Sequence, residues 1–270
     1  MKKLLFLLIA AAIALHSKDD IYLGIGPYMQ TQPYKDADPV ALASPVIFFD
    51  NSLFYIRWTR IGMYVFGNKD TELSWGISLT AQPQIIGYYE TDAFNSINSR
   101  KPTSILQGMD ERLDSWEAGV ALSFEYHTLF GEFLVLHDIF GRSNALKLRA
   151  EFGKTYSDEK WYFVPSILGI YYSEKFTNYY FGVEENEADL SLGRTYYSPD
   201  AAFNLAAQAY LKYNINEHWH LLGNARADYF ASSVSDSPLV DKNHMLSGMI
   251  SILYSFNLFG EDKAVLNLPE

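Results

Sequence analysis

The chain has 270 residues, of which 49% are hydrophobic, 16% aromatic and 20% charged, so it is long enough for one large domain and too apolar for a disordered chain. Its formal net charge of −11 excludes a typical nucleic-acid-binding protein, because neutralising phosphates requires an excess of Lys and Arg. The absence of cysteine excludes a disulfide scaffold, a thiolate nucleophile and a cysteine-ligated metal site.

Residues 1–17 predict a secretory signal peptide, followed by one domain over residues 18–270. Two lysines precede an unbroken apolar run over residues 4–15, which is too short to span a bilayer. Ala12-Ile13-Ala14 offers a cleavage site of the small-x-small type, and Ser17 is a second candidate. The sequence therefore predicts an exported protein.

Apolar and polar side chains alternate along most of the remaining chain. In residues 203–213 the odd-numbered side chains, from Phe203 to Tyr213, are all apolar or aromatic, whereas the even-numbered ones include Gln208 and Lys212. Since successive side chains of a strand point to opposite faces, this pattern predicts two-sided β-strands. The same alternation recurs in residues 73–83, 115–126, 145–156 and 219–229.

The length of these segments and the position of their aromatic residues favour a membrane barrel. A soluble strand averages about five or six residues, whereas a tilted strand needs about 9 to 11 to cross a bilayer. Trp219 and Tyr229 end one apolar face, and Trp116 and Tyr126 end another, as in the aromatic girdles of outer-membrane barrels. The alternative is a secreted soluble barrel of lipocalin type, with its apolar face inward.

We predict an all-β fold, an antiparallel transmembrane outer-membrane β-barrel of twelve strands. Residues 44–66 contain three short strands, so a ten-strand barrel is the alternative. Long polar connections are predicted at 31–43, 85–111, 174–199 and 233–243, all at one end of the barrel. The strands are expected near residues 20–30, 44–50, 53–58, 61–66, 73–84, 112–126, 130–139, 145–156, 160–173, 200–215, 218–231 and 244–256.

Candidate catalytic and ligand-binding groups are few. His218 and His220 lie on one face of a strand, but no third metal ligand is visible in the sequence. His137-Asp138 would suit a serine hydrolase, but no spacing identifies the serine. Gly24-Ile25-Gly26 is half of a nucleotide-binding fingerprint with no following helix. We therefore predict no catalytic, cofactor-binding or metal-binding residues and no enzyme activity.

Charged residues on the inward faces predict a network of ion pairs inside the barrel, since a buried charge needs a partner. The third long loop is acidic, which suits either a solvated loop or a surface that binds a cation or a partner. The network residues are Glu117, Glu125, Lys147, Arg149, Glu151, Arg226 and Asp228, and the acidic loop residues are Glu184, Glu185, Glu187 and Asp189.

Five segments, in order along the chain, are similar to motifs of one known family. They are Leu23-Gly24-Ile25-Gly26-Pro27-Tyr28; Pro45-Val46-Ile47; Leu106-Gln107-Gly108-Met109-Asp110-Glu111-Arg112, followed by Glu117-Ala118-Gly119; Asn178-Tyr179-Tyr180-Phe181-Gly182-Val183-Glu184, followed by Glu187-Ala188; and Asp236-Ser237-Pro238-Leu239-Val240-Asp241-Lys242. With these motifs the mature chain resembles the MipA/OmpV family, the MltA-interacting outer-membrane proteins. The loop residues taken as candidate site residues are Asp110, Arg112, Tyr179, Tyr180, Gly182, Val183, Asp236, Ser237 and Pro238.

The resemblance implies a location in the cell outer membrane. The member that gives the family its name is a scaffold between a murein-cleaving lytic transglycosylase and a bifunctional murein synthase. The implied function is therefore a non-catalytic scaffold whose partners are the outer-membrane lipid bilayer, a murein lytic transglycosylase and a murein synthase. A pore or an adhesin is the alternative, since other members are described as adhesins or osmotically regulated proteins.

One feature of the chain departs from the family pattern. Family members usually end at the aromatic residue of the last strand, and Tyr254-Ser255-Phe256 fits that ending. Here residues 257–270 follow as a tail, which is either a frayed terminus or part of the partner-binding surface.

Overall fold

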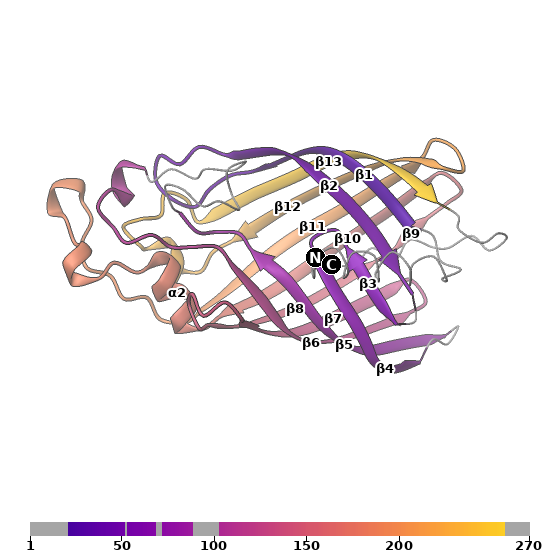
Figure 1. Cartoon of the computed structure of the whole chain (residues 1–270), viewed down its shortest axis with the longest axis horizontal. Coiled ribbons are helices and arrows are strands. Elements are labelled where there is room, and N and C mark those ends of the chain that lie inside the picture. Colours follow the sequence, from indigo (N-terminus) through magenta and orange to yellow (C-terminus); the bar gives the residue numbers. More distant parts are fainter. Residues whose placement is uncertain (1–20, 52, 69–71, 89–102, 257–270) are drawn as a thin grey trace, which may run out of the picture.

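The computed structural model describes residues 21–51, 53–68, 72–88 and 103–256, which form an antiparallel β-barrel (Figure 1). The predicted signal peptide and the tail lie outside these residues. The strands are β1 (Ile21–Gln30), β2 (Val40–Asp50), β3 (Phe54–Arg57), β4 (Arg60–Asn68), β5 (Leu73–Gln84), β6 (Ser115–Tyr126), β7 (Leu129–Asp138), β8 (Leu146–Lys154), β9 (Tyr156–Ser157), β10 (Trp161–Tyr172), β11 (Ala202–Asn214), β12 (Trp219–Tyr229) and β13 (His244–Phe256).

The sheet closes on itself with twelve strand positions. β8 and β9 both pair with β10 and follow each other directly in the chain, so they form one wall strand interrupted at Thr155. β1 pairs with β13 as well as β2, and β10 pairs with β11 as well as β8, which completes the ring. The twelve-strand prediction is confirmed and the ten-strand alternative is wrong.

The apolar faces of the strands point outward. Ile167 is 67% exposed and Ile250 is 61% exposed, whereas the inward Glu151 is fully buried. A soluble barrel of lipocalin type would show the reverse arrangement, so that alternative is wrong. Exposed aromatic residues lie at both ends of this outer apolar band, among them Trp219 and Tyr229 on β12.

Long connections gather at one end of the barrel, which we call the outer end, and short turns at the other, the inner end (Figure 1). The four long connections run over residues 31–39, 85–114, 173–201 and 230–243, close to the predicted limits. Short helices occur only within these connections in the part of the chain that the structure describes, and none is long and apolar enough to cross a bilayer. They are η1 (Ser104–Leu106), α2 (Glu174–Phe181), η2 (Glu185–Glu187), η3 (Leu190–Leu192) and α3 (Ser232–Ser235).

The hairpin of β3 and β4 is much shorter than its neighbours. β3 has 4 residues and β2 has 11, so β3 pairs only with the last part of β2, from Phe48 to Asp50. On the other side, the pairing of β4 with β5 begins at Ile61 and Ala81. Between the outer parts of β2 and β5, the described residues therefore form no strand.

Ion pairs fill much of the barrel interior. Six residues of the predicted network form three pairs: Lys147 with Glu117, Arg149 with Glu151 at 2.5 Å, and Arg226 with Asp228 at 2.6 Å. Glu125, the seventh predicted residue, is exposed near the inner turn that follows β6.

A second group of buried charges was not predicted. Arg60 on β4 binds both carboxylate oxygens of Glu132 on β7, at 2.5 and 2.9 Å, and Arg57 on β3 lies 3.5 Å from the same carboxylate. Since β5 and β6 separate these strands in the wall, the ion pairs cross the lumen. Nearer the inner end, buried apolar and aromatic side chains that include Tyr22, Phe48 and Leu253 form a further packed cluster.

Substitutions on the two faces of β11 test which face of the strand meets the membrane. We expect Ala207→Arg, on the exposed face, to destabilise the folded barrel by about 2 to 4 kcal/mol, because it places a charge at mid-membrane depth. The control is Gln208→Arg, whose side chain points into the lumen beside Glu151 and should be tolerated better. Urea unfolding in lipid vesicles measures both, and equal losses would contradict the assigned facing.

Candidate functional site: an interlocked cap on the outer end

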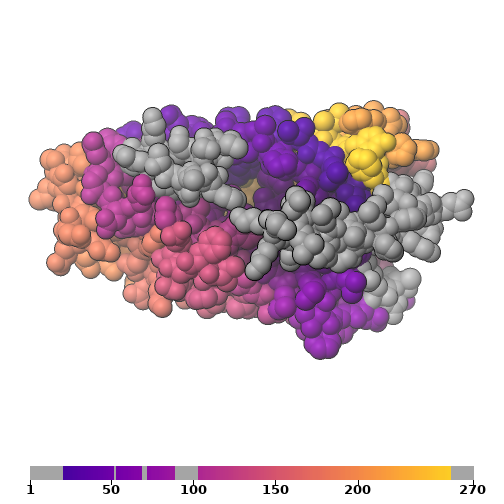
Figure 2. Space-filling view, in the orientation of Figure 1, coloured from indigo at the N-terminus to yellow at the C-terminus, as the bar shows by residue number. Residues whose placement is uncertain are grey.

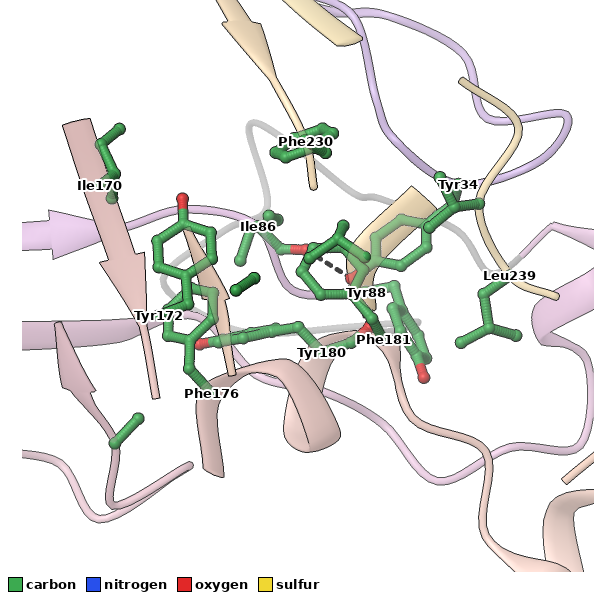
Figure 3. Packing of buried hydrophobic residues seen from close by; sticks show 14 of the residues in the cluster. Tyr34, Ile86, Tyr88, Ile170, Tyr172, Phe176, Tyr180, Phe181, Phe230 and Leu239 are labelled. Carbon is green, nitrogen blue, oxygen red and sulfur yellow. Dashed lines mark hydrogen bonds between the residues drawn. The ribbon is translucent and has the colours of Figure 1, made fainter. Parts of the chain in front are cut away.

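The long connections pack together over the outer end of the barrel, and we call their described residues the cap. Figure 3 shows aromatic side chains from separate connections meeting in one cluster, with Tyr34, Tyr88 and Tyr180 at its centre. The rings of Tyr34 and Tyr88 meet edge to face, with centroids 5.0 Å apart, and Tyr180 is fully buried. Aromatic rings of this size supply the apolar area that holds otherwise polar loops together.

Tyr34 and Tyr180, the latter on α2, connect three loops by hydrogen bonds. The Tyr34 hydroxyl lies 3.1 Å from the carbonyl oxygens of both Ile86 and Tyr180. The Tyr180 hydroxyl donates to the Leu113 carbonyl at 3.3 Å. Burial raises the pKa of Tyr180 and Tyr88 well above the ordinary value, so both hydroxyls stay protonated and able to donate.

Arg112 is the main polar link between the second and third long connections. Its Nη2 atom donates to both carboxylate oxygens of Glu187, at 2.8 and 2.9 Å, and its Nε atom donates to the Tyr179 carbonyl at 2.8 Å. The backbone N–H of Asp110 donates to the same Glu187 carboxylate at 3.0 Å. Burial acts to lower the pKa of Arg112, but Tyr88 and Glu187 hold it above its usual value.

Ser237, Val183 and Gly182 also hold the cap together. The Ser237 hydroxyl donates to the Phe181 carbonyl at 2.6 Å, and Val183 forms a β-bridge with Tyr197. Gly182 follows α2 so closely that a Cβ there would lie 2.4 Å from the Asn178 carbonyl oxygen. Asp236 is exposed and Pro238 half-buried beside Ser237. Most of the candidate loop residues therefore lie in the interlocked core of the cap.

Arg194 has an equally central place that the sequence did not indicate. It is buried, and its guanidinium donates to the carbonyl oxygens of Glu187 at 2.7 Å, Ile105 at 2.6 Å and Gln107 at 2.9 Å. Its partners are all backbone carbonyls, and two of them lie almost ninety residues away in the chain. The only signal in the sequence is a lone arginine in an acidic loop.

The predicted acidic surface is divided between two roles. Glu187 is buried against Arg112, and Asp189 accepts hydrogen bonds from the Ser191 hydroxyl and N–H, which lower the pKa of Asp189. Of the four predicted acidic residues, Glu184 and Glu185 are exposed. Throughout the described ranges, no group of three His, Asp or Glu side chains is placed to hold a metal ion.

The alternative catalytic and metal-binding groups do not assemble. His137 faces outward on β7, whereas Asp138 faces inward and accepts hydrogen bonds from Ser115, Ser143 and neighbouring backbone N–H groups. His220 already uses both ring nitrogens, with Asn214 at 2.8 Å and Ser255 at 3.0 Å, and His218 stacks on Tyr254.

Comparison with known proteins identifies relatives along nearly the whole chain. The sequence profile of the family described as MltA-interacting protein MipA matches residues 23–256. The MltA-interacting protein of Escherichia coli (strain K12) is 27% identical over 254 residues, which cover 93% of this chain and 96% of that protein. Outer membrane protein OmpV of Vibrio cholerae is 25% identical over 237 residues, covering 86% and 85%.

Among solved structures, the chain is similar to a loop-deletion variant of the outer membrane protein OmpT of Vibrio cholerae, with a TM-score of 0.40 and 7% identity. That similarity covers 88% of this chain and 99% of the other. The NanC porin is similar at a TM-score of 0.38 and 10% identity, covering 87% and 98%.

Proposed function

The chain belongs to the MipA family of MltA-interacting proteins, and from this premise we propose that it is a non-catalytic outer-membrane scaffold. Its partners in this proposal are a murein lytic transglycosylase and a murein synthase, which it holds at the inner end of the barrel. The observation that carries the proposal is the family match over residues 23–256, together with a relative named for its interaction with MltA. The inner end faces the periplasm, where the murein layer and its enzymes lie.

The turns of the inner end support a role in binding proteins. The Asp158 carboxylate accepts hydrogen bonds from the N–H groups of Lys160 and Trp161, both at 2.8 Å. Asn216 fixes the next turn in the same way, accepting from the N–H groups of His218 and Trp219 at 2.9 and 2.8 Å. A rigid surface loses little conformational entropy when a partner binds, which favours affinity.

The structure bears differently on the two alternative functions, a pore and an adhesin. A pore requires an open lumen, and the buried ion pairs of Arg57 and Arg60 with Glu132 occupy part of it. An adhesin is the second candidate, because residues 183–197 form a lobe of the cap that exposes Leu190 by 80% and Tyr196 by 58% (Figure 1). Exposed apolar groups of this kind mark interaction surfaces when they cluster.

A binding measurement with purified components tests the scaffold proposal. We expect the detergent-solubilised protein to form a stable complex with a murein lytic transglycosylase of the same organism. Reversing exposed charges of the inner turns, with Glu159→Lys and Glu217→Lys, should weaken binding about tenfold or more, because charge complementarity sets partner choice. The matched control reverses Glu184 and Glu185 in the cap, which should leave binding unchanged. Loss of binding in the control alone would reject the inner-end assignment.

A further inference from the structure

The lobe over residues 183–197 projects from the rest of the cap. It lies beyond the outer ends of β10 and β11, and Figure 2 shows it in orange at the extremity of the molecule. Two β-bridges close it in the manner of a hairpin. At its base Val183 and Tyr197 exchange backbone hydrogen bonds of 2.8 and 3.0 Å, and nearer its tip Asp189 and Arg194 exchange bonds of 2.7 and 2.9 Å. The lobe is therefore a structural unit of its own within the cap.

The tip of the lobe has a fixed shape. The Asp189 carboxylate accepts from the Ser191 N–H at 2.9 Å and so caps the short helix η3, which ends at Gly193 in the left-handed region, with a φ of 70°. Arg194, behind the tip, is buried, and its guanidinium donates to two carbonyl oxygens of the second long connection. A surface whose shape is fixed before binding loses little conformational entropy when a partner docks.

Three apolar side chains of this part of the lobe are exposed. Leu190 is 80% exposed, Tyr196 58% and Leu192 37%. The buried cluster of the cap does not include them, so they are not part of its core. The lobe also lies past the ends of the wall strands, so these side chains face water instead of lipid (Figure 1). Apolar groups gathered on a rigid, projecting surface indicate a site of interaction.

The charges around the lobe are mostly negative. Among the described residues of the connections at the outer end, ten carboxylates are exposed against three cationic side chains, and one basic and two acidic side chains are half-buried. Residues 89–102, outside the described ranges, contain two acidic and two basic residues and leave this excess unchanged. Within the lobe, Glu184 and Glu185 are exposed, whereas the one basic residue, Arg194, is buried. The exposed acidic residues are Asp36, Asp38, Asp110, Glu111, Glu174, Glu184, Glu185, Asp200, Asp236 and Asp241; the exposed basic ones are Arg142, Lys175 and Lys242; and the half-buried ones are Lys35, Asp114 and Asp189.

This combination of apolar and acidic groups selects one class of partner. An anionic lipid surface, a nucleic acid or a second copy of the cap would each bring negative charge against the exposed carboxylates, which like-charge repulsion disfavours. A purely polar cationic partner would leave Leu190 and Tyr196 uncovered. A peptide segment that carries basic residues beside an apolar face complements both features of the lobe.

We propose that the lobe is a docking surface for a cationic amphipathic peptide segment of another protein. The apolar face of the segment covers Leu190 and Tyr196, and its Lys or Arg side chains pair with Glu184 and Glu185. The negative charge of the whole cap speeds the arrival of such a segment, because opposite charges steer diffusional encounter. The proposal does not depend on the scaffold function, because the lobe and the inner turns lie at opposite ends of the barrel (Figure 1).

A binding titration with a designed peptide tests this surface. The purified protein, in nanodiscs of the zwitterionic lipid phosphatidylcholine, is titrated against a fluorescent helical peptide with leucines along one face and lysines along the other. We expect Leu190→Ser combined with Tyr196→Ser to weaken binding about tenfold or more, because it removes apolar contact area and leaves every charge in place. The matched control, Ile139→Ser with Phe140→Ser, removes two exposed apolar side chains from another outer connection and should leave binding unchanged. Equal weakening by both pairs, or by neither, would overturn the proposal.

Changes of charge test the other half of the recognition. Glu184→Gln with Glu185→Gln should weaken binding about fivefold, since each exposed ion pair contributes little alone. Glu159→Gln with Glu217→Gln, in the inner turns, is the matched control and should have no effect. Raising the ionic strength from about 0.1 M to about 1 M shortens the screening length from about 10 Å to about 3 Å and should weaken binding to the unchanged protein. Binding that neither the glutamate pair of the lobe nor salt weakens would contradict the assigned charge pairing.

Two further probes decide the class of partner. A peptide that keeps the lysines but has serine in place of leucine should not bind, and neither should vesicles of phosphatidylglycerol. Equal binding of the serine-containing peptide would overturn the proposal. Vesicle binding that is lost with Leu190→Ser and Tyr196→Ser would assign the lobe to a membrane and overturn it as well. The heat-dependent electrophoretic shift of folded barrels verifies that each variant is folded.

Discussion

Replacing Glu132 by leucine should lower the free energy of unfolding of the barrel by about 3 to 5 kcal/mol, because it leaves a buried arginine without its carboxylate. Both carboxylate oxygens of Glu132 bind Arg60, whose side chain is 2% exposed. Arg57 keeps Asp50 at 2.7 Å, so the unpaired charge would be that of Arg60. Urea unfolding in lipid vesicles, followed by tryptophan fluorescence, measures the loss.

The control for this prediction is Glu125→Leu on the neighbouring strand β6. Glu125 is exposed near the inner end, where water solvates both the carboxylate and its surroundings, so its removal should change the unfolding free energy by less than about 1 kcal/mol. Similar losses for Glu132 and Glu125 would contradict the importance of the ion pairs that cross the lumen.

Replacing Arg112 by leucine should open the cap while leaving the barrel inserted. The substitution breaks the paired hydrogen bonds with Glu187 and leaves that carboxylate buried, a loss of about 3 to 5 kcal/mol for the packing of residues 173–201. Protease added to intact cells should then cut residues 173–201, which resist cleavage in the unchanged protein.

Two variants make the Arg112 experiment specific. Arg142→Leu removes an exposed arginine from another outer loop and should not increase cleavage. The double variant Arg112→Leu with Glu187→Leu removes both charges, so it should be more resistant than Arg112→Leu alone. Cleavage that begins only after the outer membrane is broken would mean that the cap faces the periplasm.

Local patterns predicted most of the barrel wall. The alternation of side chains predicted the observed limits of β5 and β13. A strand between lipid and a polar lumen alternates apolar and polar side chains with a period of two residues, and this pattern is visible in the sequence. The same pattern missed the early start of β2 at Val40, since Ala41, Ala43 and Pro45 are small and weakly apolar. The short pairing of β3 with β2 was not predictable, because it depends on the register of two strands rather than on the pattern of either one.

Local sequence patterns could not predict the contacts within the cap. The sequence indicated Arg112 and Tyr180 as motif residues, but their roles depend on partners 67 or more residues away. Arg194 and the pair of Arg60 with Glu132 gave no periodic signal at all, since a buried charge is recognised by its partner and not by its neighbours in sequence. Helix α2 lay in a predicted loop, because its 8 residues are too few to show a period of 3.6.

The most direct test of the scaffold role is site-specific photo-crosslinking in living cells. A photoreactive residue is placed at exposed Lys160 or Glu217 in the inner turns, or at exposed Tyr196 in the cap as the control. A scaffold that binds murein enzymes at its inner end predicts covalent adducts with a lytic transglycosylase from positions 160 and 217 and none from position 196. Adducts from position 196 alone, or no adducts with a murein enzyme from either inner turn, would contradict it.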